Sequence, residues 1–594
     1  MTDETALPSP EELKEFIATA EVAATEALQK GEEESAAKLF NEILSITPSS
    51  AVAHNGIGLI AVQNNQSSIA EHHFRKAVEH APDWPDAHVN LGLLFLHGGR
   101  ARRAVKMFKR VLELTPDDTA VRYLLAQTYL TQGKRAEQEK ELRQIIADDP
   151  EHAAASNDLG VIEVQSKNFD DAIEFFKKAA DAKEPITGAR INMGSIQLIT
   201  DQNEAAEETF DQALLEQPNS IDALIGKATA QRRNGDLDGA LLTAERAASL
   251  APENGSARNA VGMVYRELGI FDAAKNNFSE AIELSPDDPA PRSNLALLNL
   301  LHGQWSKAWP DYEARVQLPN FEMSWGMPAV PKWEGQDLSG QAIVVLSEQG
   351  FGDSIHYARF LPLLAEKAGD TLFAVQPELA PLMRSLLPNV SIIEPNQPLP
   401  DIHFYSLLLS LPGHLGITGP EDIDGSAYLT APELPKALSK LLSKLDGLKV
   451  GINWRGAPRH SEDFKRSIDL EAISPLLDVD GVSFVSLDFS DSGQKKPENI
   501  TDFSSHISDF GDSAALVNAL DLVISVDTST VHLAGALGTD CWAMIPFVPD
   551  WRWQLEGDTT PWYDSVKLFR QPERNDWAGV IERIKSALEK AANA

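Results

Sequence analysis

Residues 521–538 read DLVISVDTSTVHLAGALG. The apolar, β-branched run 522–526 ends abruptly at the polar run 527–530, and a small-residue amphipathic stretch then extends to Gly538. This order predicts a buried strand, a tight turn and a helix whose first turn is rich in capping side chains. Free backbone N–H groups and the positive end of the helix dipole make such a turn a candidate phosphate site. An ordinary capped strand-to-helix connection has the same pattern, so both interpretations stay open at this point.

The same strand–helix alternation extends over residues 341–594. Alternating units of this kind predict parallel sheets with helices on both faces, here in two Rossmann-like halves that face a cleft. We place a linker at 319–340, the first half at 341–440 and the second half at 441–594. The predicted strands, in addition to 522–526, are 342–347, 371–375, 391–393, 403–409, 449–454, 483–487 and 541–545.

A different pattern, with a period of 34 residues, occupies residues 1–318. One column of the repeat holds prolines, a second only small residues, and a third alanines that are followed four residues later by an aromatic side chain. Thirty-four residues is the tetratricopeptide period, in which two antiparallel helices pack closely and a proline ends the second. The sequence therefore predicts an α-solenoid of about nine repeats. The prolines are Pro48, Pro82, Pro116, Pro150, Pro218, Pro252 and Pro286, and Pro185 lies beside the missing one.

Asparagines recur on the first helix of several repeats. The first helices line the concave face of such a solenoid, and side-chain amides there can bind an extended peptide backbone. We therefore predict that this face binds a protein, although some of these side chains could simply cap helices or contact water. The residues are Asn55, Asn90, Asn157, Asn192, Asn259 and Asn294.

Charge and cysteine content narrow the class of protein. The net charge of −36 argues against a nucleic-acid partner. The single cysteine, Cys541, excludes an internal disulfide framework and fits a reducing compartment. The amino terminus does not resemble a signal peptide, and no run approaches the roughly 20 apolar residues of a membrane helix. We expect a cytoplasmic protein without integral membrane contact.

Polar and basic clusters follow two of the predicted strands. In the first half, Gly350 and Gly352 allow close backbone approach, and Asp353 begins the next helix, where it is a candidate base or a helix cap. In the second half, a basic group suits a diphosphate or another anion, or else forms surface ion pairs with neighbouring carboxylates. This group comprises Asn453, Arg455, Arg459, His460, Lys465 and Arg466.

The second half resembles a known group of enzymes. SVDTSTVHLAGALG (525–538), PFVPDWRW (546–553), PWY (561–563) and KLFRQ (567–571) are similar to the donor half of bacterial tetratricopeptide-repeat glycosyltransferases. That group is related to heptosyltransferases and to O-linked N-acetylglucosamine transferases, all of the two-domain GT-B fold. The layout is most similar to flagellin glycosyltransferases that transfer a nonulosonic acid of the pseudaminic acid type from its CMP-activated form.

The resemblance implies roles for particular residues. Asp527, Thr528 and His532 would contact the donor nucleotide, together with Ser529 and Thr530 of the same turn; His532 could instead be a buried structural histidine. The family has glycine where this chain has Ser529. Donor phosphates would lie between this turn and the group Asn453, Arg455, Lys465 and Arg466. Asp353 would deprotonate the acceptor hydroxyl, with His356 as an alternate base.

The resemblance thus implies a protein O-glycosyltransferase that inverts the sugar carbon. No clustered metal carboxylates are evident in the sequence, so we expect the enzyme to be independent of metals and other cofactors. Its substrates would be a nucleotide-activated sugar and a Ser or Thr hydroxyl of flagellin or another Ser/Thr-rich protein. Two alternatives remain open. One is transfer of an O-linked N-acetylglucosamine- or heptose-type sugar to another protein. The other is a non-catalytic repeat scaffold or flagellin chaperone.

Overall fold

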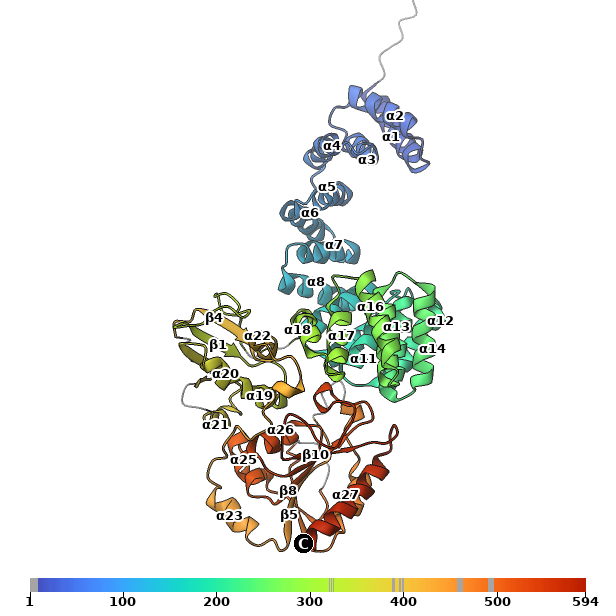
Figure 1. Ribbon diagram of the computed structural model, residues 1–594. Coiled ribbons are helices and arrows are strands. Elements are labelled where there is room, and N and C mark those ends of the chain that lie inside the picture. Colours follow the sequence, from blue (N-terminus) through green and yellow to red (C-terminus); the bar gives the residue numbers. More distant parts are fainter. Residues whose placement is uncertain are drawn as a thin grey trace, which may run out of the picture. The chain divides into compact units, whose positions relative to one another are not determined.

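A computed structural model describes residues 9–319, 321, 323, 325–386, 390–394, 397, 400–456, 463–489 and 496–593 (Figure 1). The predicted basic residues Arg459 and His460 lie outside this set. Contacts divide the chain into two compact units, residues 1–197 and residues 198–594, and each is described by itself. The division falls inside the repeats, so the later repeats belong to the same compact unit as the sheets.

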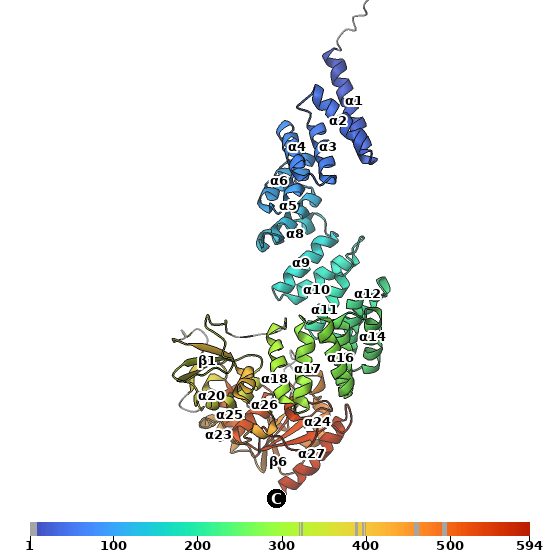
Figure 2. The same cartoon turned by 45° about the horizontal axis from the view of Figure 1, so that its top comes forward.

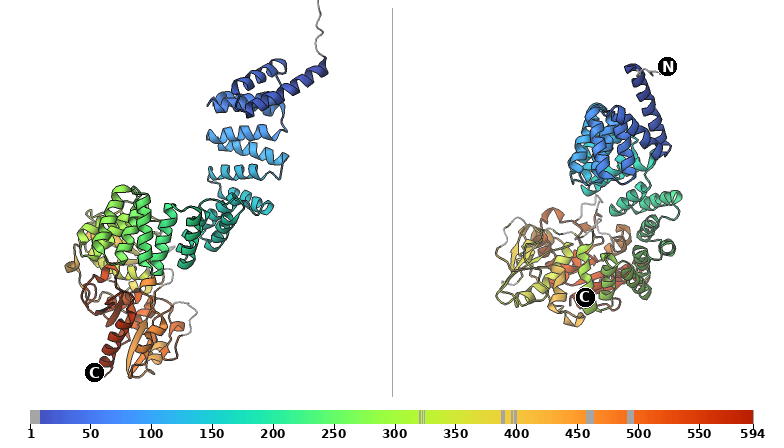
Figure 3. Two further views of the ribbon diagram at one scale, coloured as in Figure 1. Left: turned by 90° about the vertical axis from the view of Figure 1, so that its right-hand side faces the viewer. Right: turned by 90° about the horizontal axis from the view of Figure 1, so that it is seen from above.

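Consecutive helix pairs build the N-terminal unit and the beginning of the C-terminal unit, which confirms the predicted helical solenoid. Figure 3 shows the pairs of the N-terminal unit stacked on one another. Each proline of the 34-residue column follows the last residue of a second helix by two positions, as expected for a residue that cannot continue a helix. The helices are α1 (Pro10–Gln29), α2 (Glu33–Ile46), α3 (Ala51–Gln63), α4 (Ser67–His80), α5 (Pro85–His97), α6 (Ala101–Leu114), α7 (Thr119–Leu130), α8 (Arg135–Asp148), α9 (Ala153–Gln165), α10 (Phe169–Asp181), α11 (Ala189–Ile199), α12 (Asn203–Glu216), α13 (Ile221–Asn234), α14 (Leu237–Leu250), α15 (Gly255–Glu267), α16 (Phe271–Leu284), α17 (Pro289–Leu301) and α18 (Trp305–Tyr312).

The small-residue column of the repeats is explained by the aromatic column. A Cβ atom on Gly92 in α5 would stand 2.6 Å from the ring of Phe108 in α6, and one on Gly262 would stand 2.6 Å from Phe278. Both phenylalanines are fully buried. A larger side chain in the first helix would therefore push the second helix away, which is why this column tolerates only small residues.

Two parallel sheets follow the repeats within the C-terminal unit. The first has the strand order β3-β2-β1-β4 and the second the order β10-β9-β8-β5-β6-β7, and all paired strands run parallel. Every predicted strand is present to within a few residues; β7 and β10 were not predicted. The strands are β1 (Ala342–Leu346), β2 (Asp370–Ala374), β3 (Val390–Ile393), β4 (Phe404–Leu407), β5 (Leu448–Asn453), β6 (Val482–Ser486), β7 (Ile500–Thr501), β8 (Leu522–Val526), β9 (Cys541–Ile545) and β10 (Val566–Arg570).

Short helices cover the two sheets (Figures 1 and 2). One continuous apolar core joins the last repeats, both sheets and the helices between them. The helices are α19 (Phe351–Tyr357), α20 (Leu361–Ala365), α21 (Ala380–Met383), α22 (Leu411–Leu415), α23 (Lys436–Leu442), α24 (Leu470–Leu477), α25 (Phe510–Asn518), α26 (Ser529–Leu537) and α27 (Trp577–Ala592).

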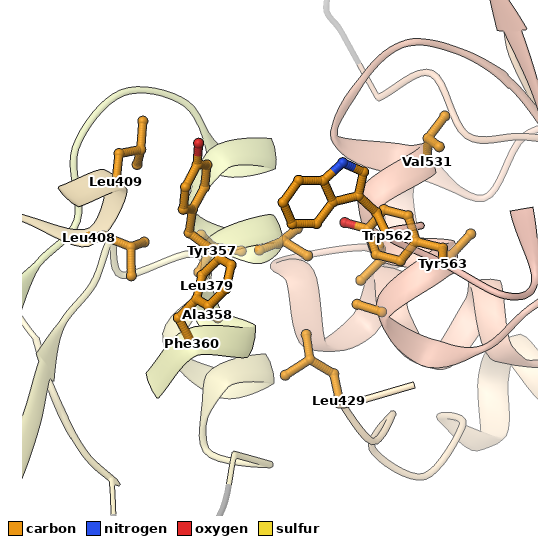
Figure 4. Close-up of a cluster of buried hydrophobic side chains, with 14 of the residues drawn as sticks. Tyr357, Ala358, Phe360, Leu379, Leu408, Leu409, Leu429, Val531, Trp562 and Tyr563 are labelled. Carbon is orange, nitrogen blue, oxygen red and sulfur yellow. The ribbon is translucent and has the colours of Figure 1, made fainter. Parts of the chain in front are cut away.

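Aromatic packing ties the last repeat to both sheets. Trp305 of α18 stacks on Trp562 with ring centroids 5.1 Å apart, and Trp551 packs edge-on against both rings. Figure 4 shows Trp562 and Tyr563 on the side of the second sheet and Tyr357 on the side of the first. These rings are buried, so the end of the solenoid is part of the same hydrophobic core as the sheets.

The predicted linker 319–340 is likewise packed in its described part. The backbone N–H of Trp333 donates to the carbonyl of Tyr405 at 2.7 Å, and the N–H of Tyr405 donates to the carbonyl of Pro331 at 3.1 Å. Trp333 is 2% exposed. This segment therefore runs along strand β4 as an edge contact and is not a free tether.

Candidate functional site

The site is built where the strand order of the second sheet reverses. Strand β5 leads outward to β6 and β7, whereas β8 leads to β9 and β10, so β5 and β8 are neighbours at the switch point. Ligands of open parallel sheets bind beyond the carboxyl ends of the strands at such points. Here β5 ends at Asn453, whose Nδ2 donates to the Oγ1 atoms of Thr528 and Thr530 at 3.1 and 3.0 Å. Asn453 therefore fixes the turn that follows β8.

That turn forms the predicted helix start. Thr528 is the N-cap of α26, and its Oγ1 accepts from the backbone N–H of Thr530 at 3.3 Å. Arg466 Nη1 donates to the carbonyl oxygen of Asp527 at 2.8 Å. The structure thus brings together four of the predicted donor residues, Asn453, Arg466, Asp527 and Thr528, with the first residues of α26.

The glycine loop of the first sheet meets this helix start. A Cβ atom on Gly352 would stand 3.3 Å from the Cα atom of Ser529 and 3.1 Å from the ring of His532. The first turns of α19 and α26 are therefore in direct contact, and a side chain at position 352 would crowd Ser529 and His532.

Asp353 lies at this junction and has two roles in the fold. Its Oδ2 accepts from the backbone N–H of Gly350 at 3.2 Å and so caps the start of α19. Its Oδ1 accepts from Arg552 Nη2 at 2.7 Å, and Arg552 Nη1 also donates to Asp550 at 2.9 Å. Arg552 belongs to the short 3₁₀ helix η7 (Trp551–Trp553) after β9, so it bridges the two halves. The sequence alone does not distinguish Arg552 from the other arginines of this half.

Burial sets the electrostatics of these carboxylates. Desolvation raises the pKa of Asp353, and Asp550 adds to the rise while Arg552 opposes it. Desolvation and then the charge of Asp550 raise the pKa of Asp527 to about 6, against the opposing charge of Arg466. A carboxylate with a raised pKa accepts a proton more readily near neutral pH, which is the property of a general base.

Both predicted histidines are buried and share one partner. His356 Nδ1 and His532 Nδ1 lie 2.9 and 3.0 Å from the hydroxyl of Tyr563. A hydroxyl donates one hydrogen bond, so one ring accepts it and the other donates to the oxygen. Burial, and next the charge of Arg552, lowers the pKa of each histidine well below its usual value.

In these positions the two histidines expose little surface that a ligand could contact. His356 is 0% exposed in this conformation, so Asp353 is the more accessible of the two predicted bases. His532 is 6% exposed and stacks on Trp553 with centroids 5.5 Å apart. This placement is that of a structural histidine in the junction between the halves.

Two of the cations predicted to bind the donor phosphates, Arg455 and Lys465, form ion pairs with carboxylates. Arg455 forms an ion pair with Asp488 at 2.8 Å. Lys465 forms a buried ion pair with Glu267, the last residue of α15. Arg466 also pairs with Asp463 at 3.1 Å, as the surface-ion-pair alternative predicted. The predicted cationic loop is therefore largely neutralised by carboxylates, because burying an unpaired cation is costly.

A pocket of about 380 Å³ opens beside the first turn of α26. Its walls combine aromatic rings, hydroxyls and two carboxylates from both halves. Among the described residues that line it there is no arginine or lysine, so this lining suits the uncharged part of a ligand better than a phosphate. Its lining includes Phe351, Glu378, Phe489, Asp509, Ser529 and Thr530.

The predicted asparagines of the repeats form pairs. Each pair joins neighbouring repeats through an Nδ2–H to Oδ1 hydrogen bond: Asn90 to Asn55 at 2.9 Å, Asn192 to Asn157 at 3.2 Å and Asn294 to Asn259 at 2.9 Å. Each bond uses one donor of one amide and the oxygen of the other.

Clusters of metal ligands and long apolar helices do not occur over the described ranges. No group of three or more His, Cys, Asp or Glu side chains there could hold a metal ion. No helix in that part of the chain is long and apolar enough to cross a bilayer.

Comparisons with known proteins agree with the repeats. Tetratricopeptide repeat families match residues 55–119, 123–185, 197–255 and 255–288. Similar solved structures include pilF of Pseudomonas aeruginosa (16% identity, 35% of this chain, 96% of that chain, TM-score 0.31) and the type IV pilus biogenesis factor PilW (19%, 35%, 96%, 0.30).

Two curated proteins are also similar. The "Probable assembly chaperone of rpl4" of Emericella nidulans is 33% identical over 99 residues, 14% of this chain and 26% of that protein. Protein FlbA of Caulobacter vibrioides is 27% identical over 493 residues, 74% of this chain and 79% of that protein. The chain thus contains tetratricopeptide repeats followed by a parallel α/β region, and it is similar to Protein FlbA over most of its length.

Proposed function

We propose that this protein transfers a sugar from a nucleotide donor to a Ser or Thr hydroxyl of a protein bound by the repeats. The observation that carries the proposal is the junction of Asp353, Arg552 and the Asp527–Thr530 turn at the switch point of the second sheet. A half-buried base candidate, two cations and a helix start meet there: Arg552 donates to Asp353, and Arg466 donates to the turn before α26. The resemblance to GT-B glycosyltransferases supplies the reaction class.

The donor would occupy the pocket and the turn together. A nucleoside would stack on Phe351 or Phe489 and direct its hydroxyls to Glu378 or Asp509, because this pocket has aromatic walls and carboxylates. Its phosphate would lie at the start of α26 beside Arg466. Arg552 supports this arrangement, since its buried Nε has no hydrogen-bond partner among the described residues and could donate to an anion.

The acceptor hydroxyl would lose its proton to Asp353 as the sugar carbon is attacked and the bond to the donor phosphate breaks. The departing phosphate would be stabilised by the helix start and by Arg466, the role that a metal ion performs in other enzymes. The raised pKa of Asp353 favours proton acceptance. By family resemblance, the donor is a CMP-activated nonulosonic acid such as pseudaminic acid, the reaction inverts the sugar carbon, and the acceptor is flagellin.

Replacing Asp353 by Asn tests the base. We expect turnover to fall by about 10²–10⁴-fold, because the group that accepts the proton is removed. Asp370→Asn is the matched control, because Asp370 is an exposed carboxylate at the amino end of β2; this variant should keep full activity. Full turnover in Asp353→Asn with normal donor binding would show that the base is another group.

A parallel assay in EDTA tests metal independence. The charge stabilisation proposed above needs no metal, so activity should be unchanged. Loss of activity in EDTA with recovery on adding Mg²⁺ or Mn²⁺ would reject this scheme.

One observation favours a second candidate, a repeat scaffold or flagellin chaperone without catalysis. Arg455 and Lys465 are committed to Asp488 and Glu267, which leaves fewer cations for a donor phosphate than the sequence predicts. Calorimetry with CMP and with other nucleotides separates the two candidates. A scaffold would bind the client protein but no nucleotide, whereas a transferase would bind both.

A further inference from the structure

The last residue of α15, Glu267, joins the repeats to the loop before α24. Its side chain is 6% exposed and lies among three cations from three segments. Lys465 of the short 3₁₀ helix η5 (Asp463–Lys465) donates to its Oε1, and Arg232 of α13 and Arg266 lie 3.3 and 3.1 Å from the same atom. Arg574, which precedes α27, donates to its backbone oxygen at 2.6 Å.

This contact is electrostatically strong. Burial alone would raise the pKa of Glu267, but the charges of Lys465, Arg266 and Arg232 outweigh it and hold the pKa well below the usual range. The carboxylate is therefore ionised, and its removal would take a negative charge from among the three cations that share it. The repeat side of the contact and the loop side are consequently held in one fixed geometry.

The loop continues directly to the donor turn. Arg466 follows Lys465 and donates to the carbonyl oxygen of Asp527. Within the loop, Asp463 accepts from Arg466 Nε at 3.1 Å and from Ser467 Oγ at 2.6 Å, so hydrogen bonds hold these three residues together. A displacement of Lys465 is thereby transmitted to Arg466 over a single peptide bond.

The repeat side of the contact carries a predicted acceptor residue. Asn259 lies on α15 two helical turns before Glu267, and its oxygen accepts from Asn294 of α17. One helix thus holds an amide of the protein-binding face at one position and the carboxylate that fixes the donor loop at another.

We propose that Glu267 is a positioning residue of the donor site: it holds Lys465 so that Arg466 supports the Asp527–Thr530 turn, and it couples the repeats to donor binding. The coupling to a donor rests on the function proposed above, whereas the positioning of the turn does not depend on it.

Hydrogen exchange of the free full-length protein tests the positioning. Glu267→Gln keeps the size of the side chain and removes its charge. We expect backbone exchange over residues 463–468 and 527–532 to become about tenfold faster, because both segments lose the same anchor. Glu253→Gln, an exposed residue just before α15, is the matched control and should leave both segments unchanged. Faster exchange at 463–468 with unchanged exchange at 527–532 would overturn the proposal.

A second pair of variants, with smaller changes, serves if Glu267→Gln does not fold. Glu267→Asp keeps the charge but shortens the reach, so exchange in both segments should increase. Adding Lys465→Arg, whose side chain is longer, should restore both segments together. Restoration of neither segment, or of 463–468 alone, would contradict the positioning role.

Donor binding supplies the remaining readout. With CMP as the probe, Glu267→Gln should weaken binding several-fold, and in the transferase assay the KM for the donor should rise with little change in kcat. Unchanged CMP affinity in Glu267→Gln, with both segments loosened, would overturn the coupling. Absence of CMP binding by the wild-type protein would reject the proposed donor, while the exchange result would still decide the positioning.

Discussion

Replacing Asp527 by Asn should stabilise the C-terminal unit above pH 6 while damaging donor binding. Burial, followed by the nearby charge of Asp550, raises the pKa of Asp527 to about 6 from its ordinary value of 3.8, although Arg466 and Trp553 oppose the rise. The folded protein therefore binds this proton more tightly than the unfolded chain does. Between these two pKa values the stability falls as the pH rises, because the folded state must ionise a buried group.

The size of the effect follows from the pKa difference. At about 1.36 kcal/mol per pKa unit, ionisation of Asp527 costs about 3 kcal/mol once the pH exceeds 6. The residue is 9% exposed, so solvent screening removes little of this cost. Asparagine has the same shape without the charge. The variant should thus gain up to about 3 kcal/mol at pH 7.5 and nothing near pH 4, where Asp527 is protonated in the folded state.

Thermal unfolding followed at pH 4 to 8 measures this difference. The transition of the C-terminal unit should rise by several degrees in Asp527→Asn at pH 7.5 and converge with the wild type at low pH. Asp478→Asn, an exposed aspartate after α24, is the matched control and should show no such pH-dependent gain. An equal gain at pH 4 and pH 7.5, or a loss at pH 7.5, would refute a buried, ionised Asp527.

Three further substitutions test the packing. Gly352→Ala should destabilise the C-terminal unit by about 1–3 kcal/mol, because the added carbon would crowd Ser529 and His532; an unchanged melting temperature would mean that Gly352 lies further from these two residues than it does here. Trp562→Ala should cost about 3–5 kcal/mol in the same unit through the cavity left beneath Trp305, and melting monitored by fluorescence checks this. Phe108→Ala should cost a similar amount in the N-terminal unit alone, so a shift of the C-terminal transition would contradict the division into units.

Local patterns predicted the elements of the fold well. The proline, small-residue and aromatic columns fixed the helix pairs because each column reflects a local requirement: a helix stop, a close approach or a filled contact. Strands such as 522–526 were predicted correctly because a buried parallel strand needs an uninterrupted apolar run. Strand β7, of two residues, gives no such run, and β10 has the alternating pattern of an edge strand.

It was harder to predict which residues, distant in sequence, form hydrogen bonds or ion pairs with one another. Lys465 and Arg466 are adjacent and both basic, yet one faces Glu267 and the other faces the donor turn. That difference depends on how α15 packs against the loop, 198 residues away in sequence, and no local pattern encodes it. Arg552 was missed for the same reason, since its importance lies in its contact with Asp353 across the junction.

The shared partner of the two buried histidines was equally hard to predict. A histidine in a motif suggests ligand contact, but the hydroxyl of Tyr563 binds both rings and the aromatic cluster encloses them. The sequence contains PWY at 561–563 without revealing that its tyrosine would reach both α19 and α26. Burial of a polar side chain is a property of the assembled core and is not visible in the spacing of residues.

The most direct test of the central claim is the intact mass of flagellin from cells with the wild-type gene, without it, and with Asp353→Asn in its place. The account predicts that wild-type cells yield flagellin heavier by whole numbers of a sugar residue attached to Ser or Thr, and that both other strains yield the unmodified mass. Identical flagellin masses in all three strains would contradict the claim that this protein is a flagellin glycosyltransferase.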